Sequence, residues 1–186
     1  MKVRSVFVSP EILCKKGGKA MKKKRRSYEV GHSPKVLVVI DDSPECDRAV
    51  YFASRRVLHS GSSATVLMLR VIETHDHGPQ WLEVADIMRA EAREEANAVL
   101  DKHAERSSSI TGIMPQRVIR EGEKAQELLA LIDDDEDIAA LVLAAATGSE
   151  GPGPLISTFS KNAGEFAIPI VIVPGSLSDA DLDTMS

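Results

Sequence analysis

The sequence predicts an α/β domain in which a parallel sheet is covered by helices on both faces. Three observations lead to this prediction. The length of 186 residues suits one domain of ordinary size. Four segments with helical character separate the apolar runs. The five short apolar runs lie at 36–40, 64–72, 116–120, 138–145 and 168–174.

The first strand is expected at VLVVI, residues 36–40, because this β-branched run is too short for a helix. It ends in two aspartates followed by Ser43 and Pro44. Ser43 is predicted to cap the next helix, with Pro44 in the first helical position, and Gly61 is predicted to end it.

The same alternation continues to the end of the chain. Strand-forming and helix-forming segments that alternate in this way predict right-handed crossovers and a parallel sheet. We therefore expect a flavodoxin-like, Rossmann-like doubly wound sheet of five parallel strands in the order 3-2-1-4-5. Ligands of such sheets bind where the strand order reverses, here between strands one and four. The later elements are a strand at 64–72, a helix at 81–106, a strand at 116–120, a helix at 124–132, a strand at 138–145, a short helix and a strand at 168–174.

Charge divides the chain unevenly. Residues 1–34 carry a net charge of +8, which leaves −13 for the remainder of a chain whose total is −5. We expect 1–34 to be a basic, disordered N-terminal tail, 35–175 to be the folded domain and 176–186 to be a polar C-terminal tail. Met21 offers a second start of translation, so the sequence leaves open whether 1–20 belong to the mature protein.

Composition restricts the partners and the compartment. The basic run at 15–26 holds no aromatic residue to stack on bases, and the rest of the chain is acidic, so nucleic-acid binding is not expected. No stretch approaches the roughly 20 apolar residues of a membrane-spanning helix, so a membrane partner is not expected either. Only two cysteines occur, Cys14 and Cys46, which fits a reducing, cytoplasmic location.

Several catalytic motifs are missing. No G-x-G-x-x-G sequence follows the first strand, and no G-x-x-x-x-G-K-[ST] loop occurs, which argues against a dehydrogenase and against a P-loop hydrolase. The five histidines lie away from the expected strand ends, so no Ser-His-acid triad is indicated. We expect no enzyme, with weak nucleotide hydrolysis left open.

The loop after the fourth strand is the candidate ligand loop. Its sequence, AAATGSEGPGPLIST at 144–158, contains glycines that let a backbone approach a ligand, and Ser157 with Thr158 could open a helix that binds an anion. The alternative is a plain connection, because glycine- and proline-rich loops usually have that role.

Residues 35–174 resemble the universal stress protein family. The similarity rests on VLVVIDDSPE, LMLRVIE, VIREGEKAQELLALI and LVLAAATGSEG, followed by IPIVIVPG. It implies a stress-response protein that binds ATP or another adenine nucleotide, with magnesium. ATP-binding members use an aspartate after strand one, a residue at the end of strand two and a G-x2-G-x9-G-[ST] loop. By resemblance, the cofactor-binding residues would be Asp41, Asp42, Ser43, Val71, Thr147, Gly148, Gly151 and Ser157.

The second half of the family loop differs in this chain. Lys161 and Asn162 follow Gly151 after the nine intervening residues of the motif, and counting back from Pro169 places Ile156 and Ser157 there instead. Isoleucine in place of glycine prevents close backbone approach, and Glu150 would repel a triphosphate. The alternative is therefore a dimeric interaction protein with a degenerate cleft. A nucleotide-dependent transferase or hydrolase is a further, less favoured hypothesis for the function.

Other features have plainer interpretations. The resemblance implies a homodimer through the last strand, Ile168 to Pro174, whose apolar edge suits a covered position. His75 and His77 are expected in a solvated loop, and Cys46 in the core. The acidic run DDDED at 133–137 is expected to be solvated rather than to bind a metal.

Overall fold

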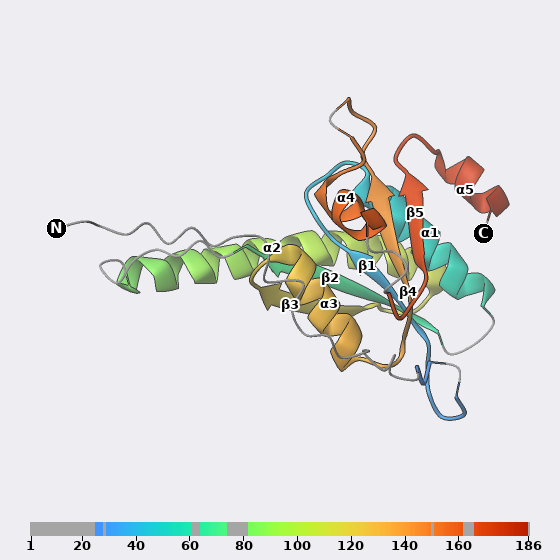
Figure 1. Ribbon diagram of the computed structural model, residues 1–186, viewed down its shortest axis with the longest axis horizontal. Coiled ribbons are helices and arrows are strands. Elements are labelled where there is room, and N and C mark those ends of the chain that lie inside the picture. Colours follow the sequence, from blue (N-terminus) through green and yellow to red (C-terminus); the bar gives the residue numbers. More distant parts are fainter. Residues whose placement is uncertain are drawn as a thin grey trace.

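A computed structural model describes residues 25–27, 29–60, 64–73, 82–149, 151–161 and 166–185. One sheet of five parallel strands has the order β3-β2-β1-β4-β5, as predicted, and helices lie on both of its faces (Figure 1). The elements are β1 (Lys35–Val39), α1 (Cys46–His59), β2 (Thr65–Ile72), α2 (Leu82–Thr111), β3 (Gln116–Glu121), α3 (Lys124–Asp134), β4 (Ile138–Ala145), α4 (Pro154–Lys161), β5 (Ile170–Pro174) and α5 (Asp179–Met185).

The sheet separates two apolar layers. Alternate side chains of β1 point to opposite faces, so Val38 packs with α1 and α2, whereas Leu37 and Val39 pack with α3 and α4. Leu100 of α2 and Leu128 of α3 are fully buried in the two layers, one on each side. A strand buried on both faces needs no polar alternation, which explains the continuous apolar run in the sequence.

Helix α1 begins later than predicted. Ser43 does not cap it: the Ser43 hydroxyl donates to Asp41, and Glu45 occupies the N-cap position. A turn closed by the Cys46 N–H and the Ser43 carbonyl, 3.2 Å apart, takes the place of the first helical residues. Gly61, the predicted helix stop, lies outside the described residues.

Helix α2 is longer than predicted and extends past the sheet. Its last residue is Thr111 rather than Arg106, and in Figure 1 its N-terminal half projects beyond the strands. Ala96, Leu100 and Ala104 are buried, whereas Ile87 and Met88 on the projecting part are exposed. None of the helices in the described part of the chain is long and apolar enough to cross a membrane.

The polar segment 176–186 contains a helix, α5, that packs on α1. Leu182 is its apolar anchor and is 1% exposed. Arginines of α1 and α2 bind its carboxylates: Arg48 pairs with Asp179, Arg55 with Asp183 at 2.9 Å and Arg106 with Asp179 at 3.1 Å.

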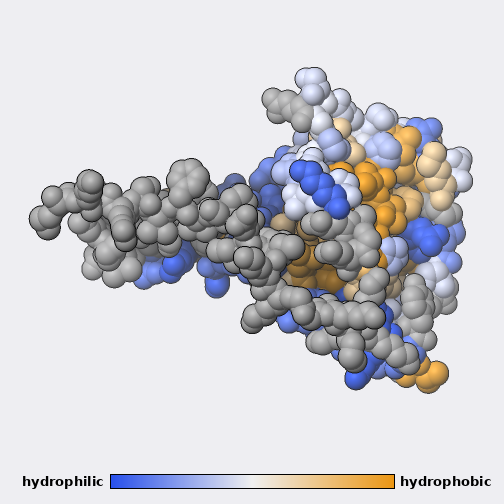
Figure 2. Space-filling view, viewed as in Figure 1, coloured by the Kyte–Doolittle hydropathy of each residue, from blue (hydrophilic) through white to orange (hydrophobic). Residues whose placement is uncertain are grey.

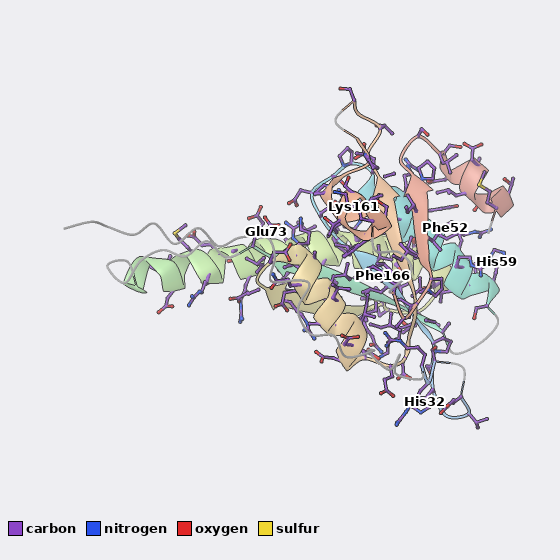
Figure 3. All side chains as sticks on the ribbon, in the orientation of Figure 1. His32, Phe52, His59, Glu73, Lys161 and Phe166 are labelled. Carbon is purple, nitrogen blue, oxygen red and sulfur yellow. The ribbon has the colours of Figure 1, made fainter. Side chains whose placement is uncertain are left out.

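The acidic run at 133–137 is paired rather than merely solvated. Basic side chains of residues 25–35 lie against it, at the end of the sheet where His32 is labelled in Figure 3. The Arg25 Nη1 atom donates to two carbonyl oxygens at the end of α3, those of Ile132 at 2.6 Å and Asp135 at 3.0 Å. The ion pairs are Arg26 with Glu136 at 2.8 Å and Lys35 with Asp135 at 2.7 Å, and a hydrogen bond of 2.7 Å joins His32 Nδ1 and Asp137 Oδ1.

Candidate functional site

A cleft of about 50 Å³ opens beyond the carboxyl ends of β1 and β4, where the strand order reverses. Its walls are mainly apolar, and its two charged side chains are Asp41 and Lys124. This position is the one where doubly wound sheets bind ligands. The lining residues are Val39, Asp41, Cys46, Lys124, Leu143, Ala144, Pro152, Gly153, Pro154, Leu155 and Ile156.

Asp41 lies two residues after the end of β1 and has a fixed orientation. Its Oδ1 atom accepts hydrogen bonds from the Ser43 backbone N–H at 3.0 Å and from the Ser43 hydroxyl at 2.5 Å. An aspartate that binds the backbone two residues ahead forms a local turn that holds its carboxylate in place. The structure therefore brings Asp41 and Ser43 together, with Asp41 in the wall of the cleft.

Asp42 and Val71 are placed away from the cleft. Asp42 is exposed, and its Oδ2 atom accepts from Arg70 Nη2 at 2.7 Å. Val71 is 5% exposed and belongs to the apolar layer that also contains Leu128 of α3. Neither residue lines the cleft, so a contact of either with a ligand stays a prediction.

Thr147 is bound by a carboxylate of the chain itself. The Glu45 Oε1 atom accepts from the Thr147 N–H at 3.2 Å and from the Thr147 hydroxyl at 3.1 Å. The stem of Glu45 passes Gly175, where an added Cβ would lie 2.2 Å from Glu45 Cγ. Hydrogen bonds from its own backbone and from Thr147 lower the pKa of Glu45, so its carboxyl group is ionised at neutral pH. Glu45 thus links the loop after β1 to the loop after β4.

The glycines of the loop after β4 differ from one another. Gly148 has open space where a Cβ would lie and no positive φ, so its lack of a side chain is not required by packing. Gly151 and Gly153 have φ values of +97° and +105°, which favour glycine. Only Gly153 of these three lines the cleft. Ser157 is exposed on α4, and its hydroxyl donates to the Gly153 carbonyl at 2.9 Å.

Ile156 and Cys46 fill space beside the cleft. Ile156 is 6% exposed and forms part of the wall, and it is the residue that counting back from Pro169 aligned with a glycine of the family loop. Cys46 is also buried, and this burial raises the pKa of its thiol to about 12. The protonated thiol is a poor nucleophile, which agrees with a packing role.

Two residues of the site were missed by sequence reasoning, Lys124 and Glu45. Lys124 begins α3 and reaches the cleft, with its Nζ atom 3.8 Å from Oε1 of Glu73, the residue after β2 labelled in Figure 3. The sequence predicted the start of this helix at residue 124, and its position just after the third strand could have indicated that Lys124 lies near the carboxyl ends of the strands. The contact of Glu45 with Thr147 joins residues 102 positions apart, so no local signal could have predicted it.

No cluster of three or more metal-ligating side chains is found among the residues that the structure describes. His75 and His77 lie outside them.

The sequence model of the universal stress protein family matches residues 33–174. The chain belongs to this family. It is a stress-response protein by that membership, and the match spans about three quarters of its length. A search of the curated proteins finds no match to this universal stress protein.

Solved structures of universal stress proteins share the fold. The protein UspA from Lactobacillus plantarum is 15% identical with a TM-score of 0.61, over 75% of this chain and 97% of that one. A universal stress protein solved in complex with cAMP is 18% identical with a TM-score of 0.56, over 77% and 98% of the two chains. An Arabidopsis thaliana member with AMP bound is 20% identical with a TM-score of 0.53, over 76% and 91%.

Proposed function

We propose that this universal stress protein binds an adenine nucleotide in the cleft between β1 and β4, and that it acts as a nucleotide-responsive regulator. The observation that carries the proposal is the position of Asp41, which a local turn holds in the wall of a mainly apolar cleft at the reversal of strand order. Apolar walls suit a base, and a fixed carboxylate suits its polar edge or the ribose hydroxyls. The two related structures with cAMP and AMP support an adenine ligand.

A regulatory rather than catalytic role is part of this proposal. The described lining residues include one thiol, Cys46, whose raised pKa makes it unreactive, and no histidine. Asp41 and Lys124 supply charge for binding, with magnesium as a counter-ion for any phosphate. We expect the protein to act in the cytoplasm, in keeping with its few cysteines.

The test compares two neighbouring aspartates. The full chain is titrated calorimetrically with ATP, ADP, AMP and cyclic AMP, with and without magnesium, and the titrations are repeated with Asp41→Ala and Asp42→Ala. Asp41 lines the cleft and Asp42 pairs with Arg70 outside it, so only the first substitution is expected to abolish binding. Absence of saturable binding to every nucleotide at millimolar concentration would refute the proposal.

We also propose a homodimer through β5. This strand is at the edge of the sheet, Ile172 on it is 46% exposed, and Figure 2 shows apolar atoms gathered over β5 beside α4. An apolar edge strand favours pairing with a second copy. Sedimentation of the wild type and of Ile172→Lys tests this proposal: a dimer that the lysine converts to monomer supports it, and a monomeric wild type contradicts it.

A second candidate function is an interaction protein whose cleft holds no ligand. The placement of Ile156 in the wall and of Glu45 on Thr147 favours it, because both occupy space or hydrogen-bond donors at the site. Its prediction is a dimer that binds no nucleotide in the titrations above.

A further inference from the structure

Lys124 is the single cation among the described residues that line the cleft. Its side chain is 26% exposed and comes from the first residue of α3. The neighbouring Glu73 carboxylate is 3.8 Å away and 58% exposed, so this ion pair is weak and a phosphate could replace it. The ammonium group has three N–H donors, which makes Lys124 suitable for one phosphate group.

The backbone at the start of α3 does not compete for that role. Glu123 caps this helix, and its side chain accepts from the N–H groups of Ala125 at 3.1 Å and Gln126 at 2.8 Å. Those amides are therefore occupied within the protein. An anion at this side of the cleft would be held by the lysine side chain rather than by the helix terminus.

Part of the loop after β4 cannot donate to additional phosphates. Pro152 and Pro154 have no N–H group. The Ala146 N–H donates to the Pro152 carbonyl at 3.3 Å, and the Thr147 N–H and hydroxyl donate to Glu45. Four positions of the loop, residues 146, 147, 152 and 154, therefore contribute no free backbone N–H group to bind a triphosphate.

Glu45 adds a negative charge on the same side. Its pKa is lowered by the hydrogen bonds that it accepts, so the carboxylate is ionised and already occupies the place of an anion on Thr147. Gly175 leaves room for this side chain to cross, because any Cβ there would overlap it. A second or third phosphate extending toward this loop would meet a carboxylate held in position.

We propose that the cleft selects ligands with a single phosphate group, that Lys124 binds this phosphate, and that Glu45 excludes longer phosphate chains from the loop after β4. This inference rests on the proposed function and specifies its ligand class. It assigns Lys124 as a binding residue and Glu45 as a specificity-determining residue.

The experiment compares affinities within one set of ligands. Full-length protein is titrated with adenosine, AMP and ATP without magnesium, so that phosphate charge is not masked. Wild type is expected to bind AMP about tenfold more tightly than adenosine and about tenfold more tightly than ATP. Lys124→Met is expected to reduce the affinity for AMP to that for adenosine and to leave the affinity for adenosine unchanged, while Lys124→Arg retains the preference.

Glu45→Gln keeps the size of the side chain and its ability to accept a hydrogen bond, but it removes the charge. It is expected to raise the affinity for ATP about fivefold relative to AMP. Matched controls outside the cleft are Lys161→Met, at the residue labelled in Figure 3, and Glu94→Gln on the exposed face of α2; both are expected to keep the wild-type ratios.

The outcomes separate the two proposals. If the wild type binds adenosine, and binds AMP and ATP with equal affinity, the proposed selection of a single phosphate group is overturned while the proposed function stands. An equal loss of adenosine and AMP affinity in Lys124→Met overturns the role of Lys124, and an unchanged ATP-to-AMP ratio in Glu45→Gln overturns that of Glu45. Failure of adenosine and of every nucleotide to bind the wild type overturns the proposed function and this inference with it.

Discussion

Gly175 leaves no space for a methyl group, so Gly175→Ala is expected to destabilise the protein by steric overlap. An ideal Cβ at this position would lie 2.2 Å from Glu45 Cγ and 2.8 Å from the carbonyl oxygen of Ala145. Carbon atoms in favourable contact are about 3.5–4.0 Å apart. The backbone φ of Gly175 is not in the left-handed region, so the effect comes from overlap and not from conformational strain.

The size of the effect follows from what has to move. Glu45 can turn away only by giving up its hydrogen bonds to Thr147, and the Ala145 carbonyl accepts the Gly175 N–H at 3.0 Å, so it is held in place. Overpacking of this kind costs about 1–3 kcal/mol of unfolding free energy. In a chain of this size each kcal/mol corresponds to a decrease of about 2–4 °C in Tm.

Urea unfolding followed by circular dichroism measures this loss as a lower midpoint at an unchanged slope. Gly148→Ala is the matched control, because nothing lies within 4 Å of its added Cβ and its φ is not positive. We expect that control to stay within about 0.5 kcal/mol of wild type. Equal stabilities of the two variants would show that Glu45 does not pack on Gly175 as described.

Three further predictions concern other parts of the fold. Leu182→Ala removes the apolar anchor of α5, which is 1% exposed, and should weaken the packing of α5 on α1 by about 2 kcal/mol or more and speed proteolysis of 176–185. Met185→Ala changes a side chain that is 61% exposed, so it should alter neither the packing of α5 nor the rate of proteolysis. Arg25→Ala should cost about 1–2 kcal/mol of unfolding free energy in urea because it removes the donor to two carbonyl oxygens at the end of α3. Arg26→Ala, whose side chain is 58% exposed, should cost less, and a similar loss in both variants would contradict this prediction. Burial lowers the pKa of His103 despite the attraction of Asp47, so the unfolded chain binds more protons and the free energy of unfolding should fall as pH drops below about 6.5. His103→Gln should lessen this fall between about pH 7.5 and about pH 5.5. Identical dependence of stability on pH in the variant and the wild type would refute the role given to His103.

The sheet could be predicted because its strands carry their signal locally. A parallel strand buried on both faces is a continuous run of branched apolar residues, and Ile138–Ala145 was predicted with the observed bounds. The strand order was the one expected for a doubly wound sheet, and the structure has it. Strand ends were less accurate: the last strand begins at Ile170 rather than at residue 168.

Elements whose stability depends on distant residues could not be predicted. Helix α5 has one buried apolar side chain, Leu182, and most of its other residues are polar, so its sequence resembles a tail. Its carboxylates are bound by Arg48, Arg55 and Arg106, which come from α1 and α2. The prediction of where α1 begins was wrong for a related reason. The Ser43 hydroxyl could bind either the start of its own helix or Asp41, and in the structure it binds Asp41.

Some residues of the candidate site could be predicted from the sequence, and others could not. Asp41 follows a strand at the reversal of strand order, which the topology alone locates. Asp42 and Ser157 were both predicted to bind the ligand, yet the Asp42 side chain pairs with Arg70 and the Ser157 hydroxyl donates to the Gly153 carbonyl. Whether a side chain points into a cleft depends on packing partners that the sequence does not indicate locally.

The passage of Glu45 between Thr147 and Gly175 connects two surfaces of this protein. Gly175 is the residue after β5, the strand proposed to pair with a second copy, and Thr147 lies in the loop beside the cleft. A ligand that moves Glu45 therefore also alters the packing at the end of the pairing strand. If ligand binding and self-association are coupled through this side chain, the coupling is reciprocal: the factor by which ligand changes the dimer constant equals the factor by which dimerisation changes ligand affinity.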